Sequence, residues 1–280
     1  MDNIDFNQPV AIGGVGGSGT RLVAEIVKQL GYFIGDDLNQ ANDNLLFTLL
    51  FKDARLWGCD QNDFNARCKI FEQVSLKVKP LEDEQITQVA HWISHRSHPS
   101  KAWLSERLNQ AVISSKASKI KLNWAWKEPN THIFLPYILN YYPNVKYIHV
   151  MRNGLDMAYS KNQNQLNLWG IKLLQYVPSM TPADSLNYWI EVHKRIKAFE
   201  KYHPKRILLV NYDKLNNGTL DELNKIINFL KIEVDKKKTD KLKLLFKAQS
   251  SSQRYKEYKN DFVTNQQIDF LTKLGFEINL

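Results

Sequence analysis

A glycine-rich segment near the amino terminus is suited to binding an anion. Residues 13–21 contain five glycines and join a short apolar segment to a helical pattern. Glycine lets the backbone fold back until several N–H groups converge, and the following helix adds its free N–H groups and the positive end of its dipole. A flexible surface turn is the alternative. Because the loop lies between a predicted strand and a predicted helix, the sequence favours a phosphate cradle.

The loop differs from two common nucleotide-binding motifs. In nucleotide triphosphatases it ends in Gly-Lys-Ser/Thr, where the lysine reaches the β- and γ-phosphates and the hydroxyl holds magnesium. Here Thr20 and Arg21 follow Gly19, which argues against a γ-phosphate and against a metal ion. Residues 14–19 also match the dinucleotide pattern G-x-G-x-x-G. However, no acidic residue that closes a second strand follows at the distance a ribose contact needs.

A second anion site is predicted at Arg152. This residue follows an apolar segment, at the edge where open α/β sheets bind their ligands. Ser160 comes eight residues later, in a helix expected to begin near Asp156. An arginine fork and a serine hydroxyl can share one phosphate, whereas Arg152 alone would equally suit a structural salt bridge. Together with the glycine loop, the pair predicts a nucleotide with phosphate groups at both ends.

Short apolar segments rich in β-forming residues alternate with helical patterns along the chain. Strands are expected at 10–12, 145–150 and 207–210, with a fourth at 119–126, and helices at 22–30, 133–141, 186–199 and 220–230. This order predicts an α/β fold with a central parallel sheet and helices on both faces. Residues 44–118 carry no clear strand pattern. We therefore expect a single domain over 1–280 with a helical insertion at about 44–118.

Composition narrows the class of protein. The 280 residues are 43% hydrophobic and 11% aromatic, which excludes a disordered chain. The formal net charge of +9 suggests an anionic ligand or a polyanionic surface. Two cysteines exclude a disulfide scaffold and a four-cysteine zinc site, and they suggest a reducing, cytoplasmic location. No apolar stretch approaches the roughly 20 residues of a membrane span, and the acidic start of the sequence does not match a signal peptide.

Three segments together resemble the PAPS-dependent sulfotransferases, whose donor is 3′-phosphoadenosine 5′-phosphosulfate. They are Gly-Gly-Ser-Gly-Thr after the first strand, Arg-x7-Ser after a later strand and Val-Asn-Tyr-Asp-Lys-Leu after a third. The resemblance implies a P-loop-like three-layer fold and in-line transfer of a sulfonate group to an acceptor hydroxyl or amine. The product would be 3′,5′-bisphosphoadenosine, and no metal would be required. The sequence does not specify the acceptor, which can be a small molecule, a carbohydrate or a peptide.

The resemblance also assigns donor-binding residues. The glycine loop would bind the 5′-phosphosulfate, Arg152 and Ser160 the 3′-phosphate, and Tyr212 would approach the adenine. Arg254 lies in a segment that resembles the basic segment closing over the donor, so it is a further candidate. The loop residues assigned in this way are Gly14, Val15, Gly16, Gly17, Ser18, Gly19, Thr20 and Arg21.

One departure from the family concerns a cation. Cytosolic sulfotransferases have lysine just before Ser-Gly-Thr and the tyrosylprotein type has arginine, whereas this chain has Gly17. The segment Trp-Lys-Glu-Pro at 126–129 resembles the Lys-Asp-Pro segment of the tyrosylprotein type. By that match Lys127 would lie against the 5′-phosphate and the transferring sulfonate. Lys127 and Arg21 are therefore the expected sources of the missing positive charge.

Two residues compete for the role of general base. Gly35-Asp36-Asp37 resembles a Gly-Glu-Glu segment from which the tyrosylprotein type uses a glutamate, so Asp37 is one candidate. His132 lies five residues after Lys127, near where the cytosolic type uses a histidine. Histidine titrates near neutral pH, whereas an aspartate needs burial or a like-charged neighbour such as Asp36 to raise its pKa. The sequence leaves both candidates open.

Other patterns predict structure rather than chemistry. His91, His95 and His98 have zinc-like spacing, but Trp92 stands where a metalloprotease needs glutamate, so no metal site is expected. The lysine run at 236–238 predicts a solvated helix start, and no nucleic-acid partner is expected. Two other functions stay open beside the sulfotransferase. They are a P-loop-type small-molecule kinase and a non-catalytic module that binds nucleotides or polyanions.

Overall fold

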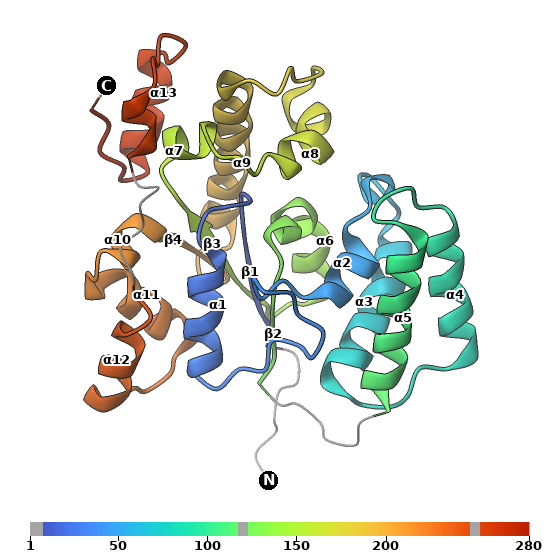
Figure 1. Ribbon diagram of the computed structural model, residues 1–280. Coiled ribbons are helices and arrows are strands. Elements are labelled where there is room, and N and C mark those ends of the chain that lie inside the picture. Colours follow the sequence, from blue (N-terminus) through green and yellow to red (C-terminus); the bar gives the residue numbers. More distant parts are fainter. Residues whose placement is uncertain (1–7, 117–122, 247–252, 280) are drawn as a thin grey trace. The chain divides into compact units, whose positions relative to one another are not determined.

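The computed structural model describes residues 8–116, 123–246 and 253–279, and Figure 1 labels its elements. The chain forms two compact units. The first comprises Met1–Ile12 and Val27–Val145, and the second comprises Gly13–Ile26 and Lys146–Leu280. The first strand and the first helix each contribute residues to both units. The single domain expected over 1–280 stays a prediction.

Four short strands form the sheet, in the order β2-β1-β3-β4. They are β1 (Val10–Gly14), β2 (Ala125–Lys127), β3 (Lys146–Met151) and β4 (Ile207–Asn211). In the first unit β1 pairs with β2 in parallel, and Ile12 lies opposite Lys127. In the second unit β3 pairs with β4 in parallel. Most strand residues are buried, as in parallel sheets generally, which confirms the predicted α/β fold.

Residues 45–115 of the first unit form helices, in the region expected to be a helical insertion. Asn44 and Asp60 cap two of these helices, because their side chains accept hydrogen bonds from backbone N–H groups of the first turn. The rings of Phe47 and Trp126 both pack against Phe71, with centroid distances of 5.8 and 5.3 Å. This aromatic core joins the helices to β2. The helical elements of the unit are α2 (Leu45–Phe51), η1 (Ala54–Leu56), α3 (Gln61–Leu76), α4 (Asp83–Ser94), α5 (Lys101–Ser115), η2 (Pro129–Phe134) and α6 (Leu135–Tyr141).

The second unit is built around the long helix α9 (Pro182–Tyr202), which packs against α7 (Gly154–Ala158) and α8 (Asn164–Leu174). Pro182 at its first turn and a Thr181–Asp184 capping box fix where α9 begins. Asp235 caps α12 (Lys236–Lys243), the helix start that the lysine run predicts. The other helical elements are α1 (Thr20–Gln29), which begins in this unit, α10 (Tyr212–Asn216), α11 (Leu220–Leu230), η3 (Arg254–Glu257) and α13 (Asn265–Lys273).

Two expected elements are matched only in part. Of the strand expected at 119–126, Ala125 and Trp126 lie in β2, and residues 119–122 lie outside the described residues. Ser160 does not lie in a helix, because α7 ends at Ala158. There the Ser160 N–H donates to the Met157 carbonyl at 3.0 Å, and the Gln163 side-chain amide donates to the Met157 and Ser160 carbonyls at 3.1 and 2.8 Å. Two of these bonds occupy the Met157 carbonyl, near the end of α7.

Candidate active site

The glycine loop needs glycine for both backbone conformation and space. Gly17 and Gly19 have φ values of +93° and +90°, in the left-handed region that favours glycine. A Cβ on Gly14 would lie 2.5 Å from the Val150 carbonyl oxygen, so only glycine fits beside β3. The Ser18 N–H donates to the Val15 carbonyl at 3.0 Å and tightens the turn. The backbone of the loop is therefore constrained by its dihedral angles, its neighbours and a hydrogen bond, unlike that of an unconstrained surface turn.

Side chains from three other parts of the second unit lie against this loop. The ring of Tyr212, at the start of α10, lies so close to Gly19 that a Cβ there would be 2.0 Å from it. The side-chain amide of Gln165, in α8, donates to the Gly14 carbonyl at 3.1 Å. Ser160 Oγ lies 3.5 Å from the position of a Cβ on Gly17. The predicted residues Ser160 and Tyr212 are thus both neighbours of the loop.

Arg152 lies just past the end of β3 and is 6% exposed. Its carbonyl accepts a hydrogen bond from the indole of Trp189 at 3.1 Å, which fixes the backbone at this point. Its guanidinium carbon lies 5.7 Å from the centroid of the Tyr212 ring, and its Nε lies 4.0 Å from the carboxylate of Asp213. Burial raises the pKa of Asp213, while the Asn153 N–H and Arg152 oppose that rise. Tyr212 therefore contacts the glycine loop and lies next to Arg152.

Arg254 is brought to the same region by the carboxyl-terminal segment. The carboxylate of Asp156, in α7, accepts hydrogen bonds from the Gln253 and Tyr255 N–H groups at 2.9 and 3.3 Å. Arg254 itself donates to the Tyr159 carbonyl at 3.3 Å, one residue before Ser160. The rings of Tyr159 and Tyr258 stack with centroids 4.2 Å apart. Of the segment that suggested Arg254, residues 251 and 252 lie outside the described residues.

All the predicted donor-binding residues other than Lys127 lie in the second unit. The chemistry of the loop suits a phosphate, because Ser18 Oγ is buried and has no hydrogen-bond partner among the described residues. Gly17 and Arg21 are exposed at the surface of the loop. Gln165 and Asp156 were not predicted from the sequence. Asp156 lies within Arg-x7-Ser, which is the one sequence signal that could have drawn attention to it.

Lys127 is the last residue of β2 in the first unit and is 2% exposed. Its ammonium group donates a short hydrogen bond to the Asp43 carboxylate and a second one to the Ala41 carbonyl, at 3.0 Å. Asp43 is held in turn by Asn39, whose side-chain amide donates to it at 2.8 Å. The expected catalytic cation is thus a buried ammonium group paired with a half-buried carboxylate. Nothing in the sequence pattern singled out Asp43 as its partner.

The two expected bases have different surroundings within the first unit. Asp37 accepts a hydrogen bond from the Arg107 guanidinium, in α5, at 2.6 Å. Burial raises the pKa of Asp37, whereas Arg107 lowers it and Glu106 adds a smaller rise. Asp36 bonds to Lys77 and Ser114, and the rise in the Asp37 pKa comes from burial and from Glu106. His132 lies in η2 and is 1% exposed.

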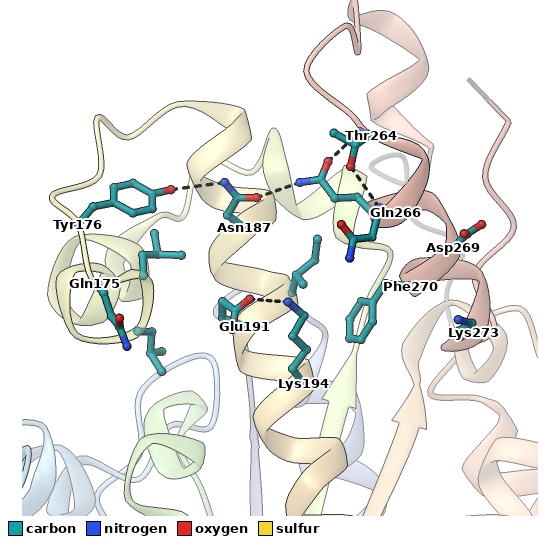
Figure 2. Close-up of a pocket in the computed structure, with 14 residues that line it drawn as sticks. Gln175, Tyr176, Asn187, Glu191, Lys194, Thr264, Gln266, Asp269, Phe270 and Lys273 are labelled. Carbon is teal, nitrogen blue, oxygen red and sulfur yellow. Dashed lines mark hydrogen bonds and ion pairs between the residues drawn. The ribbon is translucent and has the colours of Figure 1, made fainter.

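The second unit contains a hollow of about 650 Å³ (Figure 2). It is bordered by α8, α9 and α13, and its labelled side chains include Tyr176, Asn187, Lys194 and Phe270. None of the residues predicted from the sequence to bind donor or to act in catalysis lines it. Among the described residues, no group of three or more histidine, cysteine or acidic side chains is arranged to hold a metal ion. No helix in the described part of the chain is long and apolar enough to cross a membrane.

Comparison with known proteins decides the family. The family model described as the sulfotransferase family matches residues 9–236, which include the glycine loop, Lys127 and the Arg152–Ser160 segment. The chain belongs to the sulfotransferase family. No curated protein sequence matches it significantly.

Solved structures of sulfotransferase domains share the fold. The sulfotransferase domain from the Synechococcus PCC 7002 olefin synthase is 12% identical with a TM-score of 0.52, covering 97% of this chain and 96% of that one. The sulfotransferase domain from the curacin biosynthetic pathway is 12% identical with a TM-score of 0.51, covering 97% and 99%. At this identity the likeness is one of fold.

Proposed function

We propose that the protein transfers a sulfonate group from 3′-phosphoadenosine 5′-phosphosulfate to a hydroxyl or amine of an acceptor. Membership of the sulfotransferase family supports the class of reaction. The observation that supports this donor is the position of Tyr212. Its ring contacts Gly19 of the glycine loop and lies beside Arg152, so the two predicted anion sites are neighbours in one unit. A nucleotide that carries phosphate at both ends suits two such sites.

Each group has a defined task in this proposal. The N–H groups of residues 14–21 and the Ser18 hydroxyl bind the 5′-phosphosulfate, where the loop and the start of α1 offer positive dipoles. Arg152, Ser160 and Arg254 bind the 3′-phosphate, with the arginine forks supplying charge-assisted bonds. Tyr212 borders the nucleotide between the two ends. The bound donor supplies an activated sulfonate, so the chain needs to position it and stabilise charge.

Lys127 supplies positive charge to the leaving phosphate in this proposal, since Gly17 leaves the loop without its usual cation. The acceptor must also lose a proton as it attacks sulfur, and Asp37 and His132 are the bases that the sequence offers. The acceptor itself can be a small molecule, a carbohydrate or a peptide. The two free cysteines, Cys59 and Cys68, fit a reducing compartment, and we therefore expect the enzyme to act in the cytoplasm.

Two other functions make different ligand predictions. A small-molecule kinase needs a cation for the γ-phosphate and a hydroxyl for magnesium, and Thr20-Arg21 replaces the residues that usually supply them. A non-catalytic module would bind nucleotide or polyanion without transfer. The net charge of +9 is compatible with the non-catalytic binding module but does not favour it over the sulfotransferase.

Ligand-dependent melting separates the three functions. A ligand that binds only the folded state raises the melting temperature, and at equal concentration a tighter ligand raises it more. We expect 3′,5′-bisphosphoadenosine to raise it, and ATP with magnesium to raise it much less. Stabilisation by ATP with magnesium alone would favour the kinase, and stabilisation by heparin alone would favour the polyanion-binding module. Transfer of radiolabelled sulfonate from the donor then distinguishes an enzyme from a nucleotide-binding module.

A further inference from the structure

The connection between α7 and α8 runs beside the glycine loop, and both belong to the second unit. Ser160 Oγ lies 3.5 Å from the position of a Cβ on Gly17. The amide nitrogen of Asn162 lies 3.3 Å from the position of a Cβ on Gly16. Gln165, in the first turn of α8, donates to a carbonyl of the same loop at 3.1 Å. The connection therefore flanks several consecutive residues of the loop.

Hydrogen bonds within the connection orient the side chain of Asn162. Its Oδ1 accepts the Asn164 N–H at 3.4 Å, and its own N–H donates to Ser160 Oγ at 3.2 Å. The Gln163 side chain holds the same turn by donating to the Ser160 carbonyl at 2.8 Å. Because Oδ1 faces Asn164, Nδ2 is the end of the amide nearer to Gly16, at 3.3 Å against 3.6 Å for Oδ1. Asn162 thus turns its hydrogen-bond donors toward the glycine loop.

Two side-chain donors beside the loop are available to a ligand. Asn162 is exposed, and its Nδ2 bonds to no other described residue. The Ser160 hydroxyl accepts the Asn162 N–H and donates to no described residue, so its hydrogen is available as well. These donors lie next to Gly16 and Gly17. Position 17 is where the loop lacks its usual cation, so the connection offers neutral donors at that place.

The loop and Asn162 together suit an anion with several oxygen atoms. Ser18 Oγ is buried and has no hydrogen-bond partner among the described residues, and α1 begins at Thr20 with free N–H groups. Asn162 adds an amide donor at the exposed side of the loop, where Gly17 is also exposed. An amide N–H that donates to an ionised oxygen makes a charge-assisted bond, which is about twice as strong as a bond between neutral groups.

We propose that the Asn162 side-chain amide binds the 5′-phosphosulfate of the donor and takes over part of the task of the absent loop cation. This inference rests on the proposed function. Asn162 would then be a donor-binding residue outside the glycine loop, on the 5′ side of the nucleotide. Its contribution should depend on the 5′-phosphate and not on the 3′-phosphate, which gives a test that needs no acceptor.

Asn162→Ala should weaken the binding of 3′,5′-bisphosphoadenosine by about tenfold, as for the loss of a hydrogen bond to a charged group. Adenosine 3′-monophosphate lacks the 5′-phosphate, so its affinity should stay within about twofold of the wild-type value. Calorimetry with the two nucleotides measures both effects. A substitution that only loosens the fold would weaken the binding of both nucleotides together.

Asn162→Asp separates a ligand contact from a structural role more sharply. The aspartate has the same shape and keeps an oxygen that accepts the Asn164 N–H, so it preserves the turn. It also places a negative charge beside Gly16, and like charges that face each other at a binding site are strongly unfavourable. Bisphosphate affinity should therefore fall further than in Asn162→Ala, whereas a structural role predicts affinity close to that of the wild type.

Two neighbours in the sequence provide matched comparisons. Asn164→Ala removes an exposed amide two residues away, whose backbone N–H and not its side chain bonds to Asn162, and it should leave bisphosphate affinity within about twofold. Lys161 is the exposed cation between Ser160 and Asn162. If Lys161→Ala weakens bisphosphate binding and Asn162→Ala does not, the missing charge comes from Lys161 and the assignment of Asn162 is wrong.

The outcomes also separate this inference from the proposed function. Bisphosphate affinity that is unchanged in both Asn162 variants, or that is higher in Asn162→Asp than in Asn162→Ala, would overturn the inference and leave the sulfotransferase intact. That order of affinities decides the question even if adenosine 3′-monophosphate binds too weakly to measure. A wild-type protein that does not bind the bisphosphate would instead contradict the proposed function.

Discussion

The aromatic ring of Tyr212 lies directly on the backbone of Gly19. A Cβ at Gly19 would be 2.0 Å from Cδ2 of the ring and 2.2 Å from Cε2. Tyr212 is 2% exposed, and burial raises the pKa of its hydroxyl, so the ring is fixed in a closed environment. The contact links residues 193 positions apart and sets the loop against α10. The conformation of the anion-binding loop thus depends on a side chain that follows β4.

Replacing Gly19 with alanine should damage the loop. The substitution combines a left-handed backbone, which costs about 1–2 kcal/mol for a residue with a Cβ, with a clash against a buried ring. We expect affinity for 3′,5′-bisphosphoadenosine to fall at least about tenfold, since a shift of the ring or the loop misplaces the N–H groups. Calorimetry with the bisphosphate measures the effect.

Gly218→Ala is the control for backbone strain alone. Gly218 has a φ of +83° and nothing within 4 Å of a Cβ. This variant should lose stability through conformation but keep its affinity for the bisphosphate. Equal loss of affinity in both variants would show that the contact between Tyr212 and Gly19 is not what shapes the loop.

Arg152→Ala should reduce the preference of the protein for a nucleotide with two phosphates. A hydrogen bond to a charged group contributes about 1.5–3 kcal/mol, so bisphosphate affinity should fall at least about tenfold. Affinity for AMP, which lacks the 3′-phosphate, should change little. Lys205→Ala, which removes an exposed cation from the same unit, is the matched control and should leave both affinities unchanged. If wild-type protein binds AMP and the bisphosphate equally in calorimetry, the assignment of Arg152 is wrong.

Sulfonate transfer should not require a divalent metal. This prediction rests on the loop sequence, in which Thr20-Arg21 replaces the lysine and hydroxyl that hold phosphates and magnesium in nucleotide triphosphatases. Radiolabel transfer from the sulfonate donor should proceed at an unchanged rate in EDTA. Activity that disappears in EDTA and returns with magnesium would support the kinase alternative.

Stability should fall as the pH decreases from about 6.5 to about 4, because of His193. Burial lowers the pKa of this imidazole from 6.5 to about 4. Burial holds the ring neutral in the folded state, against the opposing effect of its Nδ1–H bond to the Trp189 carbonyl at 2.6 Å, and its Nε2 lies 3.4 Å from Nε2 of His149. Between the two pKa values the unfolded chain binds a proton that the folded chain does not. The free energy of unfolding therefore rises with pH across this window.

The pH effect can be isolated with His193→Phe. A shift of this size corresponds to about 3 kcal/mol between pH 7.5 and pH 4, since one pKa unit is about 1.4 kcal/mol. Urea unfolding at several pH values should give a flatter profile for the variant than for the wild type. Parallel profiles would mean that other groups, and not His193, produce the acid sensitivity.

The sequence alone determined those features that depend on neighbours along the chain. The positions of β1, β3 and β4 follow from short apolar runs, because a strand buried on both faces needs apolar residues throughout. The glycine loop was visible because it follows a strand and precedes a helix. The family was visible because its motifs are short segments with fixed spacing. α11 covers the predicted residues 220–230, since its apolar positions repeat with helical period.

Tertiary structure decided which charged groups meet. Lys127 and Asp43 are 84 positions apart, and Asp37 and Arg107 are 70 positions apart. No periodicity indicates that α5 brings an arginine to Asp37 or that a turn held by Asn39 brings a carboxylate to Lys127. A charge in a sequence has many possible partners, and only packing selects one by removing both groups from water together. For that reason the motifs revealed the chemistry, whereas the partner of each catalytic candidate depended on the fold.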